Sequence, residues 1–220
     1  LNMLDTNLIK RVYRERINNV ENTVSNFTLY IEFKPDTVPY ANYNFYKYNI
    51  MDVWDCTSYT KKDWPRNYIF MHQVPQKNVV FAESGILISY MQYSEVENWH
   101  DTYIGKRGED YHLFKEAKKE ILLGQLEKDF PGIRNNIKSV YTSTPLTLRD
   151  YTGTKEGSMY GVLKDINSLE QTFISHRTKV PNLLFTGQNI NSHGILGVSI
   201  SAFITSSEFI DLKKTISDIF

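Results

Sequence analysis

FTLYIEF, residues 27–33, alternates apolar or aromatic side chains with more polar ones along its length. Such an alternation of β-branched and aromatic residues favours a β-strand with one face in a protein core. The pattern lies within residues 22–34 and is followed by Pro35. The sequence therefore predicts a strand over 22–34 that ends at this proline.

Other strand and helix patterns lie on both sides of this stretch. Extended segments are expected at 43–50, 68–73, 79–93 with a break near Ser84-Gly85, 137–143 and 182–185. Helices are expected at 5–20, 52–59, 108–130 and from about 193 to 218, with a turn at Thr144-Pro145 and an irregular polar stretch over 150–161. Because helices are inserted among clustered strands without regular β-α-β alternation, we predict an α+β fold with a mixed or antiparallel sheet.

Composition narrows the function classes. The chain has 220 residues, of which 41% are hydrophobic, so it is able to form a sizeable core. Its 25 Lys and Arg residues balance its 25 Asp and Glu residues, which makes nucleic acid a poor candidate partner. A single cysteine, Cys56, excludes an internal disulfide and a thiolate zinc cluster, and we expect it to be a small buried residue in a cytoplasmic protein.

Aromatic residues and histidines suggest opposite conclusions about sites. The chain has 15 Tyr and 12 Phe, many of them within 40–48, and these would line an apolar pocket with polar tips or simply pack as strand residues. The five histidines are scattered without a close His-x-x-x-His or His-Glu spacing, so no metal site is expected.

Residues 182–202, NLLFTGQNINSHGILGVSISA, contain the most informative pattern in the chain. A buried strand that ends in Thr-Gly-Gln-Asn and leads through small residues into a helix brings backbone N–H groups and a positive helix end together. An anionic or electron-rich ligand suits such a site. The structural alternative is a tight strand-to-helix crossover in which Gly194 and Gly197 only permit close packing.

The TGQN at 186–189 and the HGILG at 193–197 resemble the C-terminal flavin motif of the phytoene desaturase and retinol saturase family, within the amine-oxidase-like flavoprotein superfamily. The resemblance implies a FAD cofactor. It also implies that the cofactor is contacted by Gly187, Gln188, Asn189, His193, Gly194, Ile195 and Gly197.

Two further stretches resemble the same family. Residues 143–161, STPLTLRDYTGTKEGSMYG, are similar to the segment that leads the substrate domain back towards the flavin, and residues 16–33 resemble a substrate-domain strand more weakly. From the first of these the resemblance implies substrate contacts by Arg149, Tyr151 and Tyr160. The alternative for Arg149 is a local ion pair with Asp150. The implied domains are a substrate-binding domain at 1–180 and the last strand and helix of a FAD-binding domain at 181–220.

The implied activity is hydride transfer with flavin N5, which saturates or desaturates a carbon–carbon bond of an apolar, carotenoid- or retinoid-type polyene. None of the eleven glycines occurs as Gly-x-Gly, so we expect the dinucleotide-binding half to lie outside this sequence and the chain alone not to retain FAD. The expected partner is an apolar small molecule, with peripheral membrane contact left open. The alternative is a non-catalytic domain that binds an apolar ligand or a partner.

Overall fold

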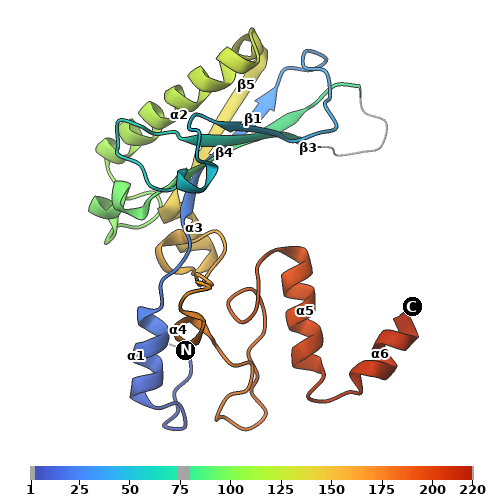
Figure 1. The fold of residues 1–220 in the computed structure, drawn as a ribbon. Helices are drawn as coiled ribbons and strands as arrows, with labels where there is room; N and C mark the ends of the chain where they lie inside the picture. The colour runs from blue at the N-terminus through green and yellow to red at the C-terminus, as the bar shows by residue number, and fades with distance from the viewer. Residues whose placement is uncertain (1–2, 74–79, 220) are drawn as a thin grey trace. The chain divides into compact units, whose positions relative to one another are not determined.

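A five-stranded sheet is built around strand β1 (Ser25–Phe33) in the computed structural model, which describes residues 3–73 and 80–219. The strand order is β2-β3-β4-β1-β5, and every neighbouring pair is antiparallel (Figure 1). The other strands are β2 (Phe45–Tyr48), β3 (Asn67–Gln73), β4 (Ser84–Met91) and β5 (Ile137–Ser143). The predicted α+β class with an antiparallel sheet is confirmed.

One face of this sheet is the main core. The side chains of Phe27, Leu29, Ile31 and Phe33 alternate along β1 and are all buried. Helix α2 (Glu109–Asp129) covers this face and contributes the buried residues Tyr111, Leu122, Leu123 and Leu126 to the same cluster. The period-2 pattern of β1 and the helical period of α2 thus meet in one apolar layer.

A buried ion pair lies at the edge of this core. The Lys118 ammonium pairs with the Glu95 carboxylate, and the Tyr59 hydroxyl donates to the same carboxylate at 2.6 Å. The Lys118 Nζ also lies 4.2 Å from the centroid of the Trp64 ring, a cation–π geometry. Burial lowers the pKa of Lys118, while Glu95 opposes that change. These contacts join α2 to two segments that flank the strands.

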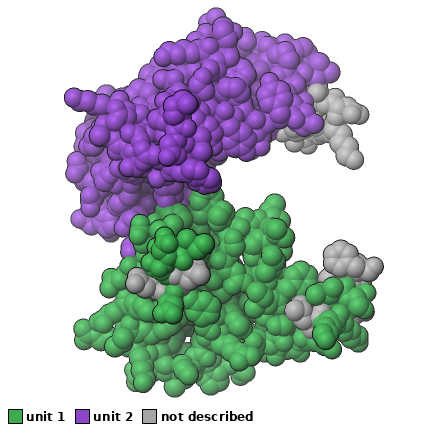
Figure 2. Space-filling view, viewed as in Figure 1, with its two compact units in different colours: residues 1–23, 160–220 green, residues 24–159 purple. Residues whose placement is uncertain are grey.

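Contacts divide the chain into two units, shown in two colours in Figure 2. One unit is residues 24–159, which hold the sheet, α2 and α3 (Pro145–Thr152). The other joins residues 1–23 to 160–220 and holds α1 (Arg11–Asn19), α4 (Leu169–Thr172), α5 (Gly194–Ser206) and α6 (Leu212–Ile219).

This division differs from the predicted boundary at residue 180. Residues 1–23 join residues 160–180 because Thr23 N donates to the Gly161 carbonyl at 2.8 Å and Leu163 N donates to the Glu21 carbonyl at 2.9 Å. Val162 N donates to the Asn189 side chain at 3.0 Å, which joins them to the C-terminal segment. A small core of Val20, Val162, Ile174 and Ile190 fills this unit. Which unit binds substrate or cofactor stays a prediction.

Several local expectations need correction. No strand forms at 182–185, where Asn182 has a left-handed φ of 60° and Leu184 makes only an isolated bridge with Arg177. The final helix that was expected from about 193 to 218 forms as two helices, α5 and α6. The Asp211 side chain accepts from Lys213 N at 2.9 Å and caps the N-terminus of α6. The expected helix at 5–20 begins only at Arg11.

The helix α3 was missed where a turn was expected. Thr144 accepts from the backbone N–H groups of Leu146 and Thr147, and the Thr147 side chain accepts from Thr144 N in return. Pro145 occupies the first helical position, where its missing N–H costs nothing. The expected extended segment at 79–93 is shorter, since β4 begins at Ser84; residue 79 lies outside the described residues.

His72 on β3 lies in an aromatic environment. The centroids of the Phe33, Tyr40 and Phe70 rings lie 5.8, 6.0 and 5.1 Å from its ring, and its Nδ1 accepts from Ala41 N at 3.1 Å. Burial lowers the pKa of His72 below its usual value. The folded state therefore favours the neutral ring.

We predict that this histidine makes the fold sensitive to mild acid. The unfolded chain takes up a proton near the usual histidine pKa of about 6.5, whereas the folded chain resists it, so stability is full above that pH and falls as pH falls through it. The melting temperature should decrease from pH 7.5 to 5.5, and His72→Gln should decrease less. An equal decrease in the melting temperature of both proteins would show that His72 is not the source of the acid sensitivity.

Candidate functional site

The turn that follows Phe185 holds three of the seven predicted cofactor contacts, Gly187, Gln188 and Asn189. Gly187 has a φ of 100°, in the left-handed region that favours glycine, and Ile190 N donates to its carbonyl at 3.1 Å. Gly187 N donates to the Ser201 hydroxyl of α5 at 3.0 Å, so this N–H has a partner within the chain. Nothing lies within 4 Å of the position that a Cβ on Gly187 would take, which leaves open space beside the turn.

Asn189 is bound to the chain itself. Its side-chain oxygen accepts from Val162 N at 3.0 Å and occupies the space next to Gly161, where a Cβ would lie 2.0 Å from that oxygen. Gln188 beside it is half-buried. The turn is therefore fixed on the segment 161–164 as well as on α5.

The start of α5 brings two predicted residues together. His193 is the N-cap residue, and its ring lies 4.5 Å, centroid to centroid, from the ring of Tyr160. Gly194 has a φ of 78°, again with nothing within 4 Å of a Cβ position. The first turn of a helix has N–H groups without intrahelical acceptors, an arrangement that favours an anionic ligand.

Helix α5 turns its small residues inward. Gly197 and Ser201 are buried, whereas Ile195 is 91% exposed and Leu196, Val198, Ile200 and Phe203 are also exposed. A Cβ on Gly197 would lie 2.5 Å from the Ser192 carbonyl oxygen. Gly197 therefore permits close packing, as the structural alternative proposed, and Ile195 presents its side chain away from the core.

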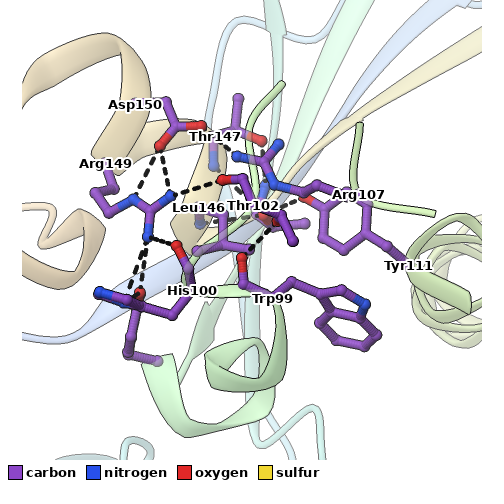
Figure 3. A network of polar contacts seen from close by, with 11 residues as sticks. Trp99, His100, Thr102, Arg107, Tyr111, Leu146, Thr147, Arg149 and Asp150 are labelled. Carbon is purple, nitrogen blue, oxygen red and sulfur yellow. Dashed lines mark hydrogen bonds and ion pairs between the residues drawn. The ribbon is translucent and has the colours of Figure 1, made fainter. Parts of the chain in front are cut away.

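Arg149, a predicted substrate contact, lies in a polar network of the 24–159 unit (Figure 3). It donates to the His100 carbonyl at 2.7 Å and to the Tyr93 hydroxyl at 3.2 Å, and it pairs with Asp150, which also pairs with Arg107. The network links α3 to the loop before α2. Arg149 is thus held by contacts within this unit, and Tyr151 is 74% exposed on the same helix.

The predicted site residues consequently fall in both units. Arg149 and Tyr151 belong to residues 24–159, whereas Tyr160 and the seven cofactor candidates belong to the other unit. Within that other unit the structure brings together Tyr160, His193, Asn189 and the glycine turn. Their roles in binding stay predictions.

A second feature, which we call the tyrosine face, covers the side of the sheet opposite α2. Strand register places Tyr46, Ile69 and Ile88 in one row and Met71, Ile86, Tyr30 and Tyr141 in the next. Tyr30, Tyr46 and Tyr141 are exposed and the four aliphatic or thioether side chains are half-buried. None of these side chains is charged; a Glu32–Lys138 ion pair at 2.6 Å lies one row further on.

This face was only partly expected. Tyr43, Tyr46 and Tyr48 are exposed, but Phe45 packs against the main core, as in ordinary strand packing. The contribution of β1 and β5 to this face was not predicted. In the sequence, Tyr30 and Tyr141 occupy the alternate positions that point away from the core, and only the strand register shows that they are neighbours.

Two other features concern metal binding and membrane insertion. Among residues 3–73 and 80–219 no three His, Cys, Asp or Glu side chains are grouped so that they could hold a metal ion. No helix in this part of the chain has the length and apolarity needed to cross a membrane. Cys56 is buried, as predicted, and its burial raises the pKa of the thiol.

The curated relatives found by comparison all carry the same protein name. The chain is 31% identical to the all-trans-retinol 13,14-reductase of Homo sapiens over 125 residues, 32% identical to that of Rattus norvegicus over 114, and 27% identical to that of Danio rerio over 124. These alignments cover 56%, 50% and 55% of this chain. They support the resemblance to the retinol saturase family.

The matches are partial with respect to the relatives. The chain spans about a fifth of the length of the curated relatives that it matches, 20%, 19% and 20% for the three proteins. No protein-family model matches the sequence.

We predict that Gly197→Ala destabilises the chain. Replacing glycine by alanine inside a helix normally stabilises it by about 1 kcal/mol, but here the new methyl group would meet the Ser192 carbonyl oxygen. Ser199→Ala, at an exposed position of the same helix, should be neutral or stabilising. Urea denaturation measures both, and a stabilised Gly197→Ala protein would show that α5 does not pack as described.

Proposed function

We propose that this chain is part of a FAD-dependent oxidoreductase that reduces a carbon–carbon double bond of a retinoid-like polyene. In this proposal the 24–159 unit binds the polyene on its tyrosine face, and the turn at 186–191 with the start of α5 contributes to cofactor binding. The names of the relatives favour reduction over desaturation.

The tyrosine face is the observation that carries the substrate class. A polyene is long, uncharged and apolar, so binding it against charged groups would cost their desolvation. Tyr30, Tyr46 and Tyr141 offer a large apolar area, and their hydroxyls keep the surface compatible with water when it is empty. The half-buried Ile69, Met71, Ile86 and Ile88 complete an uncharged surface across β1 to β5.

The residues of the glycine turn fit one part of a flavin dinucleotide. Gly187 and Gly194 leave space for a ligand to approach the backbone closely, and the α5 N-terminus favours a phosphate group. The exposed Ile195 offers an apolar contact beside them. When bound, a flavin supplies two-electron hydride chemistry. This chain's tasks would be to hold the cofactor in place and to keep water from the polyene.

The alternative function is non-catalytic binding of an apolar ligand. The tyrosine face supports it equally well, since binding a polyene there does not require a flavin. The two functions differ in whether the glycine turn binds FAD, so polyene binding and cofactor binding need separate measurements.

For the polyene, we predict that the chain binds all-trans-retinol and that the Tyr30→Ser, Tyr141→Ser double variant binds it at least about tenfold more weakly, a loss of about 1.4 kcal/mol. The two side chains are direct cross-strand neighbours. Tyr103→Ser is the control, because Tyr103 is exposed in the same unit but lies outside the sheet. Retinol fluorescence titration measures all three; equal affinities would refute the assignment of this face.

For the cofactor, we predict that Gly187→Val weakens FAD binding in a polypeptide that joins this chain to a Gly-x-Gly-x-x-Gly half. Gly105→Val is the matched control, since Gly105 also has a positive φ and open space around it. Both variants carry similar strain of about 1–2 kcal/mol, so only cofactor obstruction separates them. Melting curves without FAD check folding, and equal FAD affinities in well-folded variants would remove the turn from the cofactor site.

A further inference from the structure

The 186–191 turn lies outside the sheet and still has a defined conformation. Backbone bonds fix its two ends, Phe185 N to the His176 carbonyl at 2.7 Å and Ile190 N to the Gly187 carbonyl at 3.1 Å. The residues between these ends include Gln188 and Asn189, and no strand neighbours them among residues 160–219. The conformation of the turn therefore depends on contacts with side chains from elsewhere in the unit and not on hydrogen bonds between β-strands.

Lys164 makes three hydrogen bonds that hold this turn or a neighbouring segment. Its Nζ donates to the carbonyl oxygens of Asn189 at 2.8 Å, Thr172 at 3.3 Å and Ile190 at 3.4 Å. An ammonium group has three N–H donors, which is enough for these three acceptors. Hydrogen bonds from a charged donor are stronger than neutral ones, and Lys164 is half-buried, where water competes less.

The second contact comes from Asn189 itself. Its side-chain oxygen accepts from Val162 N, two residues before Lys164, so the same short segment holds the turn twice. Gly161 makes this possible, because any larger residue would put a Cβ 2.0 Å from that oxygen, and its φ of 76° also favours glycine. We call Gly161, Val162, Lys164 and Asn189 together the lysine clasp.

The geometry points to Lys164 as a positioning residue that holds the 186–191 turn through the lysine clasp. The side-chain oxygen and the main-chain oxygen of Asn189 are both committed to the chain. The consequence for cofactor binding rests on the proposed function. The positioning of the turn does not.

Three variants of the chain test the clasp. Lys164→Met keeps an unbranched side chain that is one atom shorter and removes its donors, and Lys164→Arg restores charged donors. Lys179→Met is the control, because Lys179 is an exposed lysine of the same unit. Hydrogen exchange followed by mass spectrometry compares the peptide 185–191 with peptides from the rest of both units.

We expect Lys164→Met to speed exchange in 185–191 roughly tenfold or more while leaving β1, β4 and β5 unchanged. Lys164→Arg should recover most of the protection, and Lys179→Met should behave like the unmodified chain. Unchanged exchange in Lys164→Met would overturn the proposal. Equal acceleration throughout the 1–23 and 160–220 unit, or no recovery with Lys164→Arg, would also overturn it, because either result indicates general destabilisation.

FAD affinity, measured in the polypeptide that contains the Gly-x-Gly-x-x-Gly half, separates this inference from the proposed function. If Lys164→Met loosens the turn and weakens FAD binding, the lysine clasp and the proposed cofactor role of the turn are both supported. If it loosens the turn and FAD affinity is unchanged, the lysine clasp stands and the turn is not a cofactor site.

Discussion

The pairing of β1 on both of its edges is the constraint on which the 24–159 unit depends. β4 and β5 both bond to this strand, so its register fixes which side chains of three strands enter the core. A shift by one residue would move Phe27, Leu29 and Ile31 to the opposite face and would place Tyr30 under α2. The core and the tyrosine face are therefore two results of one register.

Elements whose ends are marked by local signals in the sequence were predicted well. β5 matches its expected range, and α2 differs from its own by one residue at each end, because Gly108 and Pro131 mark the limits of the helix. The helix α3 and the restart at α6 depend on capping side chains, Thr144 and Asp211, whose signals are one residue long. The division into two units depends on bonds between residues more than 130 positions apart, such as Thr23 with Gly161, which no local pattern encodes.

The same distinction applies to the candidate site. The glycine turn and the start of α5 were predicted because they form one continuous motif, and Tyr160 joins them in the structure. Arg149 was singled out by resemblance, yet its guanidinium is occupied by His100, Tyr93 and Asp150. Lys164 and Gly161 were not predicted, since neither stands in a recognisable motif and their importance appears only through contacts with Asn189. Motifs identify the turn, but the residues that hold it require a structure.

The outward direction of the large side chains of α5 also affects how the chain behaves in solution. A helix that packs through Gly197 and Ser201 exposes the apolar side chains of Ile195, Leu196, Ile200 and Phe203 to water. Surfaces of this kind associate with one another when nothing else covers them. Self-association of the isolated chain should therefore increase with protein concentration, and the working concentration becomes a variable that any measurement on it has to control.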